Sequence, residues 1–379
     1  MVSKLIDICN YANGKIAVAG LTAQNYISTE SMLSNKGGIT TATNLPTVEQ
    51  TQAYRKNDVL VSNIRPYFKK IWFADCDGGC SNDVLVFRAA DGVDPTFLYY
   101  VLADDNFFNY ATATSKGTKM PRGDKGAIMG YSVPTLDIEV QRKIGALLSS
   151  IDQKITVNSN INDKLQQQLF SLYENMAMTS PCSKEYTLSN LCDFQEGYVN
   201  PPQTHPEFFD GEVKWLRAVD INESFITDTS RTLTKAGFEG AKKSALLFKP
   251  NTIAISKSGT IGRLGIIADY MCGNRAVINI APHDANMLAF IYCFLKSKQR
   301  EFPDMAVGSV QKNLYVSLLE PLSVSIPDEK SLTAFNAAGA SILDMIHNNC
   351  VENTYLANLR DTILPKLMSG EIDVSDIQL

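Results

Sequence analysis

The stretch "QKITVNSNINDKLQQQLF", residues 153–170, reads as part of a long amphipathic helix that carries two asparagines where apolar residues are expected. A heptad frame over residues 144–176 has apolar side chains at eight of its ten seam positions, and Asn158 and Asn162 occupy the other two. A polar residue in a helix–helix seam lowers stability but fixes the register, because only another polar group opposite can satisfy it. The pattern therefore predicts that this helix pairs with a second helix that offers polar groups at the matching height.

A matching helix is indicated near the C-terminus. A shift of 191 residues carries the heptad frame to residues 335–367, and Asn349 and Asn353 recur at the phase of the first pair. Two surface helices with chance asparagines are the alternative, but the recurrence favours a paired coiled coil. In an antiparallel seam each a position meets a d position. The register that satisfies both pairs sets Asn158 opposite Asn353 and Asn162 opposite Asn349.

The same register predicts three weak points in the pairing. Arg360 faces Ile151 and Gly339 faces Leu172, so the apolar seam is interrupted toward both ends. Pro365 has no backbone N–H and is expected to end or kink the second helix.

An internal repeat extends over both halves of the chain. Three stretches of the first half recur in the second at offsets between 183 and 194 residues. The matched pairs are "KLIDICNYANGK" (4–15) with "TLSNLCDFQEGY" (187–198), "DVLVSNIRPYFKKIWFAD" (58–75) with "TIAISKSGTIGRLGIIAD" (252–269), and "SVPTLDIEVQRKIGALLSSID" (132–152) with "SIPDEKSLTAFNAAGASILD" (325–344). Because a repeat of this length sets the architecture, we interpret the chain as two copies of one unit.

Each copy has the same order of expected elements. Short runs of β-branched and aromatic residues, such as "DVLVSNI" (58–64) and "TIAISK" (252–257), predict strands. A helix is expected next, at residues 94–111 and 285–302, and the much longer arm helix follows. The fold class is mixed α/β (α+β), with two pseudo-repeated α/β modules joined and separated by two long helices that form an antiparallel coiled coil. The expected segments are a first module at 1–132, a helical arm at 133–180, a second module at 181–324, and a second arm with the C-terminal tail at 325–379.

Composition narrows the class of protein. The 379 residues are 45% hydrophobic and 20% charged, which suffices for two or three domains with their own cores. No apolar run approaches the roughly 20 residues of a membrane helix, so a soluble, cytoplasmic protein is expected. The eight cysteines are spread along the chain, which suits reduced, buried thiols. Cys76 and Cys80 could supply half of a zinc site, but no histidine lies near them, and we predict no metal site.

The net charge of −5 arises in the C-terminal segment. Residues 325–379 carry 3 basic and 8 acidic residues, so the rest of the chain is neutral overall. Within it, "YRKNDVLVSNIRPYFKK" (54–70) has five basic residues against Asp58 alone. A local basic surface is therefore compatible with the acidic pI.

The repeat of a variable α/β module with a coiled-coil arm resembles the specificity subunit of type I restriction-modification systems, and the likeness covers essentially the whole chain. The motifs that carry it are "NDVLVSNIRPYFKKIWFAD" (57–75), "SVPTLDIEVQRKIGALLSSIDQKI" (132–155), "GEVKWLRAVDI" (211–221), "TIAISKSGTIGRLGII" (252–267) and, as the most specific, "LRDTILPKLMSGEIDV" (359–374). The first arm begins "LDIEVQRK", where the family often has Pro-Leu before the glutamate, and the second begins "PDEKSLTAF" without the glutamine.

The resemblance implies a DNA-reading subunit without catalytic activity of its own. Each target-recognition module would read one half of a bipartite, asymmetric site in double-stranded DNA. The helical arms would dock two methyltransferase subunits, and motor-nuclease subunits would join in the full complex. S-adenosylmethionine, ATP and Mg are expected on these partner subunits, and no cofactor is expected on this chain.

Reading DNA requires Arg, Lys, Asn, Gln and Ser side chains on loops that reach a groove, and the loops before each arm supply them. The predicted DNA-binding residues of the first module are Ser62, Asn63, Arg65, Tyr67, Lys69, Lys70, Lys116, Lys119 and Arg122. Those of the second module are Ser256, Lys257, Ser258, Thr260, Arg263, Asn274, Arg275, Ser309, Gln311, Lys312 and Asn313. Any one of them is equally consistent with an ordinary solvated side chain. Their equivalent placement in both copies favours DNA, with the basic residues of the first module contacting phosphates.

Three motifs that suggest other chemistry are interpreted differently. "NPPQ" (200–203) has Gln203 where the Asn-Pro-Pro-aromatic motif of amino-methyltransferases has a ring, so it is read as a turn. "SGTIGRLG" (258–265) lacks the spacing of a phosphate-binding loop, and its glycines are expected to allow close backbone approach between strands. The three histidines lie in unrelated contexts, and no catalytic residue is predicted. A catalytic DNA amino-methyltransferase and a non-DNA coiled-coil scaffold remain as alternatives.

Overall fold

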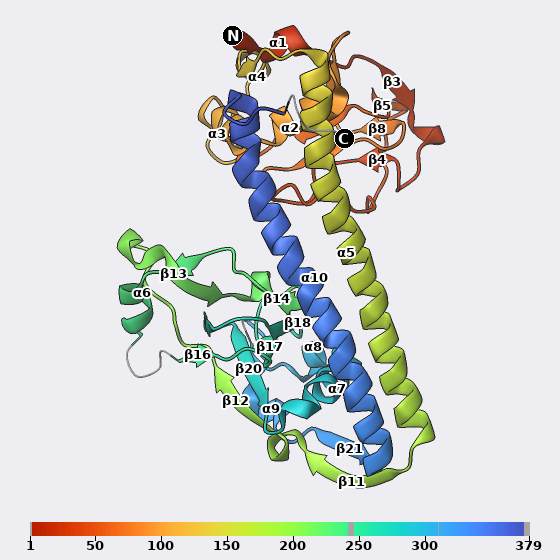
Figure 1. Ribbon diagram of the computed structural model, residues 1–379, viewed down its shortest axis with the longest axis vertical. Helices are drawn as coiled ribbons and strands as arrows, with labels where there is room; N and C mark the ends of the chain where they lie inside the picture. The colour runs from red at the N-terminus through yellow and green to blue at the C-terminus, as the bar shows by residue number, and fades with distance from the viewer. Residues whose placement is uncertain (1, 242–245, 310, 375–379) are drawn as a thin grey trace. The chain divides into compact units, whose positions relative to one another are not determined.

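The computed structural model describes residues 2–241, 246–309 and 311–374 and divides into two compact units. Unit 1 comprises Met1–Lys154 with Leu356–Leu379, and unit 2 comprises Ile155–Tyr355. Two long helices, α5 (Ile138–Thr179) and α10 (Glu329–Ser369), each contribute a segment to both units (Figure 1). The boundary between the two units therefore falls inside both long helices and does not coincide with the expected boundaries between modules and arms.

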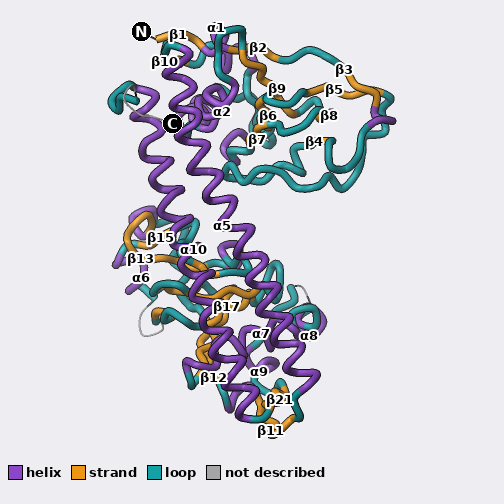
Figure 2. Tube along the Cα trace, turned by 45° about the vertical axis from the view of Figure 1, so that its right-hand side comes forward, coloured by secondary structure: helices purple, strands orange, loops and turns teal. Residues whose placement is uncertain are grey.

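The shorter elements of unit 1 are β1 (Val2–Lys4), α1 (Leu5–Ile8), β2 (Cys9–Tyr11), β3 (Lys15–Ala17), β4 (Tyr26–Ile27), β5 (Gln50–Tyr54), β6 (Val59–Ser62), β7 (Ile71–Phe73), β8 (Gly78–Cys80), β9 (Val84–Ala89), α2 (Pro95–Ala103), α3 (Asp105–Ala113), α4 (Lys125–Met129) and β10 (Ser132–Pro134). They form an antiparallel sheet of order β2-β9-β6-β7, a second sheet of order β3-β5-β8-β4, and a two-stranded ribbon β1-β10. Figure 2 shows β6, β7 and β9 grouped beside the strands of the second sheet.

The shorter elements of unit 2 are β11 (Cys182–Thr187), β12 (Cys192–Glu196), β13 (Phe209–Leu216), β14 (Phe225–Ile226), β15 (Thr232–Leu233), α6 (Lys235–Glu239), β16 (Leu247–Phe248), β17 (Ile253–Ser256), β18 (Leu264–Ile267), β19 (Met271–Gly273), β20 (Val277–Pro282), α7 (Leu288–Lys298), α8 (Phe302–Met305), α9 (Val316–Leu319) and β21 (Ser323–Pro327). The main sheet has the order β12-β20-β17-β18-β14, the second sheet is β15-β13-β19-β16, and β11 pairs with β21.

The repeat predicted from the sequence is confirmed by the strand order. The first four strands of the main sheet in unit 2 correspond, one for one, to the four strands of the main sheet in unit 1. The ribbons also correspond, since each joins the start of a module to the strand that leads into its long helix. The loops that connect equivalent strands therefore leave the main sheet at the same end in both copies.

The single helix expected at 94–111 is instead two helices, α2 and α3. The Asp94 carboxylate accepts a hydrogen bond from the Phe97 amide at 2.9 Å and caps α2. Asp104, in extended conformation, interrupts the helix and caps α3 by accepting from the Asn106 amide at 2.8 Å. Both helices bury aromatic and aliphatic side chains, including Phe97 and Phe107, against the main sheet. Aspartate caps favour helix starts, which explains why the apolar periodicity is broken into two pieces.

The asparagines of the two long helices pair inside unit 2 in the antiparallel register expected from the sequence. The Asn158 amide donates to Asn353 Oδ1 at 2.9 Å and to the Glu352 carboxylate at 2.7 Å. The Asn349 amide donates to Asn162 Oδ1 at 2.8 Å. Asn158 is 1% exposed, so its polar atoms depend on these partners for satisfaction.

The helices were predicted to pack weakly at Arg360 and Gly339, but both residues make close contacts with neighbouring elements. In unit 1 the Arg360 guanidinium donates to Asp152 at 2.6 Å, and the other carboxylate oxygen accepts from the Tyr100 hydroxyl at 2.6 Å. The long arginine side chain therefore leaves the apolar seam for a polar partner on the neighbouring helix. In unit 2 a Cβ on Gly339 would lie 2.6 Å from Ala289 Cβ, so the glycine lets α10 approach α7 closely.

The sequence predicted that Pro365 would end or kink the second long helix, but helix α10 continues through this residue to Ser369. Leu364 and Leu367, at 3% and 1% exposure, pack into the core of unit 1 together with Leu148 of α5. Burial of these leucines offsets the one hydrogen bond that proline cannot donate.

Removing one partner of an asparagine layer tests its contribution to stability. Asn349→Leu should lower the free energy of unfolding by about 1–3 kcal/mol, because Asn162 Oδ1 loses its donor inside the seam. Replacing Asn162 by Leu as well should restore the wild-type value or exceed it, since no polar group is left unpaired. Urea denaturation measures both effects.

The matched control is Asn348→Leu, which changes an exposed residue of the same helix and should alter stability by less than about 0.5 kcal/mol. Equal destabilisation in the single and double variants at 162 and 349 would contradict the pairing.

Candidate nucleic-acid interface

Three loops meet at one end of the main sheet in unit 1. Because β6 and β9 are antiparallel, Ser62 at the end of β6 lies beside Val84 at the start of β9. The Asn63 amide donates to Asp83 O at 2.8 Å, and the Gly123 amide donates to Asn63 O at 3.1 Å. These bonds hold together residues 62–70, 81–83 and 116–122, which we call loop edge 1.

Unit 2 builds the same arrangement from equivalent residues. The Lys257 amide donates to Ala276 O at 2.7 Å, and the Leu314 amide donates to Lys257 O at 2.9 Å. We call the resulting set, residues 256–263, 274–276, 307–309 and 311–313, loop edge 2. The sequence-predicted residues of each module, although distant along the chain, are therefore neighbours in space.

The last loop of each edge is a tight hairpin. Lys116 and Arg122 exchange two backbone hydrogen bonds of 2.9 Å, and Val307 and Asn313 exchange two of 3.0 and 2.9 Å. Gly117 and Gly308 occupy the same position in the two hairpins, with φ of +94° and +141°. A side chain at Gly308 would also collide with Gln311 O, at 2.2 Å from the added Cβ. The glycines close both hairpins, and the described tip residues extend into solvent.

The predicted residues differ in how far they reach solvent. Exposed side chains belong to Tyr67, Lys116, Lys119, Arg122, Thr260, Arg275, Ser309, Gln311 and Lys312. Intermediate exposure is found at Arg65, Lys69, Lys70, Lys257, Ser258, Arg263, Asn274 and Asn313, whereas Ser62, Asn63 and Ser256 are buried. The Ser256 hydroxyl donates to Thr260 O at 2.5 Å and accepts from the Arg263 amide at 2.8 Å. Ser62 similarly donates to Ile64 O at 3.1 Å, so the equivalent serines shape the loops from within.

Several cations of loop edge 1 are held by carboxylates. Lys69 contacts Asp105 at 2.8 Å, and Lys36, which the sequence reasoning missed, contacts the same carboxylate at 2.9 Å. Burial opposes ionisation of Asp105, but hydrogen bonds from the two lysines hold its pKa below the ordinary value. Lys70 donates to Thr29 O at 2.6 Å, and burial lowers the pKa of its ammonium group.

Other basic side chains of this edge differ in their pairing. Lys116 pairs with Asp124 at 2.5 Å, and Arg122 pairs with Asp83 at 3.1 Å. Within the described parts of the chain, Arg65 and Lys119 have no carboxylate partner. These two residues are the cations most available to a bound anion.

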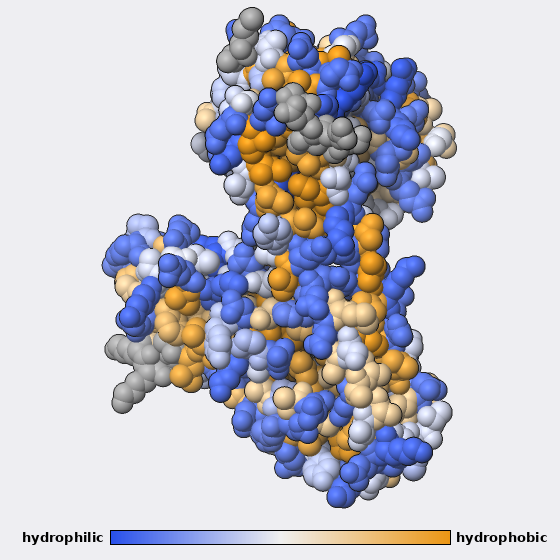
Figure 3. Space-filling model, in the orientation of Figure 1, coloured by the Kyte–Doolittle hydropathy of each residue, from blue (hydrophilic) through white to orange (hydrophobic). Residues whose placement is uncertain are grey.

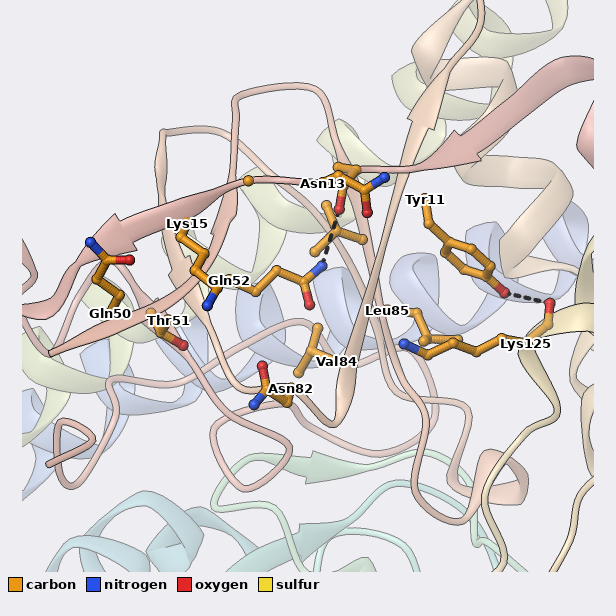
Figure 4. Close-up of a pocket in the computed structure, with 13 residues that line it drawn as sticks. Tyr11, Asn13, Lys15, Gln50, Thr51, Gln52, Asn82, Val84, Leu85 and Lys125 are labelled. Atoms are coloured by element: carbon orange, nitrogen blue, oxygen red, sulfur yellow. Dashed lines mark hydrogen bonds between the residues drawn. The ribbon is translucent and has the colours of Figure 1, made fainter. Parts of the chain in front are cut away.

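A pocket beside loop edge 1 is lined by amide side chains that the sequence reasoning did not single out. It has a volume of 620 Å³ and opens between β2, β5 and the start of β9. Figure 4 shows Gln52 extending toward the segment that carries Asn13, with Asn82 and Lys15 around the same opening. Gln50 and Gln52 share one face of β5, which is the sequence signal that could have indicated them. The pocket adds hydrogen-bond donors and acceptors to the edge.

The corresponding place in unit 2 has different chemistry. Lys257, at the position of Asn63, contacts Glu196 at 2.9 Å and lies 4.7 Å from the centre of the Tyr315 ring. The side chains of Lys257 and Glu196 are only 13% and 22% exposed. Equivalent backbones thus carry an amide-rich pocket in one unit and an ion pair in the other.

The motifs that suggested other chemistry have structural explanations. "SGTIGRLG" joins β17 to β18, and Gly259 and Gly262 have φ of +76° and +86°, which confirms a glycine turn between strands. Gln203 accepts a hydrogen bond from Arg231 at 2.8 Å within a loop. No group of three or more His, Cys, Asp or Glu side chains in the described residues is arranged to hold a metal. Among the helices of those residues, none has a stretch long and apolar enough to cross a membrane.

Comparison with known proteins identifies the family. The family model described as "Type I restriction modification DNA specificity domain" matches residues 1–167 and 183–356, once for each copy of the repeat. The chain therefore belongs to this family.

Two relatives are similar over most of the chain. The type I restriction enzyme HindI specificity subunit of Haemophilus influenzae is 24% identical over an alignment of 433 residues, covering 92% of this chain and 94% of that protein. The MjaIX specificity subunit of Methanocaldococcus jannaschii is 23% identical over 309 residues, covering 76% and 71%. The crystal structure of a type I restriction-modification S subunit from M. genitalium aligns with a TM-score of 0.56 and 17% identity, covering 97% of this chain and 96% of that one. This last likeness shows the shared fold.

Proposed function

We propose that the chain is the non-catalytic DNA-recognition subunit of a type I restriction-modification complex. Each unit reads one half of a bipartite, asymmetric site in double-stranded DNA through its loop edge. The observation that carries this proposal is that one backbone arrangement is built twice, with the same hydrogen bonds and different side chains. Two equivalent platforms with different chemistry suit the reading of two unlike half-sites.

The side chains of the edges have the chemistry that DNA recognition requires. Lysine and arginine on loop edge 1 suit phosphate oxygens, and the neighbouring Asn and Gln side chains suit base edges. Loop edge 2 exposes Gln311 and Lys312 on its hairpin and Arg275 on the neighbouring turn. Both edges therefore combine groups for positioning the duplex with groups for reading its bases.

The long helices supply a surface for the methyltransferase subunits. Val157, Ile161 and Leu172 of α5 are 51%, 43% and 37% exposed and lie on one face of the helix. Figure 3 shows apolar surface along this helix. A run of exposed apolar side chains on a helix is typical of a protein-binding surface. S-adenosylmethionine, ATP and Mg would be bound by the methyltransferase and motor-nuclease subunits.

The alternatives are separated by simple binding measurements. A catalytic amino-methyltransferase needs a glycine-rich loop between a strand and a helix, whereas the glycines here turn between antiparallel strands. Titration of the isolated chain with S-adenosylmethionine should give no saturable binding. If the chain were only a coiled-coil scaffold, it would add no sequence-specific binding of duplex DNA when assembled with its methyltransferase partners.

Methylation mapping tests the division of labour between the units. In cells that carry the chain and its methyltransferase, methylated bases should define two short half-sites separated by unread base pairs. Replacing Gln311 and Lys312 by Ala should change the preference in one half only, because the hairpin at 307–313 belongs to unit 2. A single continuous palindrome, or altered preference in both halves, would refute the proposal.

Salt dependence tests the phosphate contacts. Replacing Arg65 and Lys119 together by Gln should weaken binding to all sequences and reduce the slope of log K against log salt by about 2, since each phosphate contact contributes about 0.9. Lys4→Gln is the matched control, because Lys4 is exposed and lies in β1, which pairs with β10 in a ribbon separate from the main sheet. An unchanged slope in the double variant would remove these residues from the interface.

A further inference from the structure

Loop edge 1 exposes an aromatic pair on an unusually constrained turn. Residues Pro66–Phe68 form a single 3-10 turn between β6 and β7. Tyr67 is 47% exposed and Phe68 is 37% exposed, and their rings meet edge to face with centroids 4.8 Å apart. A single exposed apolar residue is ordinary on a protein surface, but two adjacent exposed aromatic rings are not. Such a pair beside a basic loop indicates a binding site.

The backbone on both sides of the turn is strained. Arg65 and Lys69 have φ of 50° and 51°, a left-handed conformation that residues with a side chain seldom adopt. Asn35 and Lys36, in the loop that packs against the turn, are also left-handed, with φ of 55° and 61°. Strain of this kind persists only where the surroundings over-determine the backbone, and it gathers at binding sites.

Hydrogen bonds to two other segments hold the turn in place. The Asn35 amide donates to Phe68 O and the Lys36 amide donates to Lys69 O, both at 2.8 Å. On the other side, the Arg65 amide donates to Pro121 O of the hairpin at 2.8 Å. The rings are therefore presented on a rigid support, and little conformational entropy is lost when they bind.

The charges around the pair favour a nucleic acid as the partner. Lys36 and Lys69 share the single carboxylate of Asp105, which leaves one positive charge in excess. The Arg65 guanidinium lies 6.0 Å from the Phe68 ring centre, and its buried Nε has no hydrogen-bond partner among the residues that the structure describes. An apolar tip surrounded by cations matches a base stack flanked by phosphates.

We propose that the Tyr67–Phe68 turn acts as a wedge that stacks against, and locally unstacks, one base step in the half-site read by unit 1. The Tyr67 ring stacks on the bases. The Phe68 ring, which lies beside the Arg65 guanidinium, packs against the Tyr67 ring and holds it in position. This inference rests on the proposed DNA-reading function and adds how the first half-site is contacted.

Unit 2 provides an internal comparison. Its equivalent turn, residues 257–263, contains Gly259 and Gly262 and no aromatic residue. Unstacking by this device is therefore expected in one half-site only. The two halves would be recognised by different mechanisms on the same backbone platform.

The experiment uses the chain assembled with its methyltransferase partners and duplexes that carry 2-aminopurine at successive positions of both half-sites. Fluorescence should rise at one step of the half-site read by unit 1. Tyr67→Ala should abolish this rise and lower affinity roughly ten-fold, whereas Tyr67→Phe should retain both, because stacking needs the ring and not the hydroxyl. Methyltransferases flip bases themselves, so a signal that persists in Tyr67→Ala belongs to the partner.

Tyr270→Ala is the control, since Tyr270 is 55% exposed and follows β18 at the end of the unit 2 sheet away from loop edge 2. It should leave affinity and fluorescence unchanged. Wild-type fluorescence and affinity in Tyr67→Ala would overturn the wedge while leaving the DNA-reading function intact. Failure of Tyr67→Ala to assemble with the methyltransferase would instead make the rings a protein contact. Absence of DNA binding by the wild-type complex would overturn the proposed function itself.

Discussion

The pairing of asparagines between α5 and α10 is the interaction on which the arrangement of the long helices depends. Apolar seams tolerate slippage, because one leucine packs against another in several registers. A buried amide does not, since it must meet a partner at hydrogen-bond distance. Asn158 with Asn353 and Asn162 with Asn349 therefore select one antiparallel register. In that register Gly339 of α10 lies near Leu169 of α5, whose Cδ1 would be 3.4 Å from an added Cβ.

A second constraint is the strand order shared by the two units. Antiparallel neighbours in the main sheet bring the end of one strand beside the start of the next, so loops from distant parts of the sequence gather at one end. The backbone bonds that join these loops are the same in both units, whereas the side chains differ. Duplicated scaffolding with divergent loops allows one fold to present two binding chemistries without altering its core.

Much of this architecture could be predicted from the sequence because it follows from periodicity. The repeat, the strand regions and the asparagine register were all visible as spacings in the sequence. What could not be predicted depends on side chains meeting across the fold. Arg360 finds Asp152 and Tyr100 because a long cation can leave the seam, and α10 continues past Pro365 because Leu367 is buried beyond it. The alternation of Gln50 and Gln52 on β5 is visible in the sequence, but no linear pattern shows that Asn13 and Asn82 join them or that Lys36 lies beside Lys69.

Disulfide trapping tests the single antiparallel register most directly. Cys76, Cys182 and Cys350 are the cysteines that are not buried, so replacing these three removes the most accessible native thiols from an Asn158→Cys, Asn353→Cys variant. The account predicts rapid crosslinking of this pair within one chain under mild oxidation, with little crosslinking in the Asn158→Cys, Asn349→Cys variant. Efficient crosslinking of 158 to 349, or crosslinking only between chains, would contradict it.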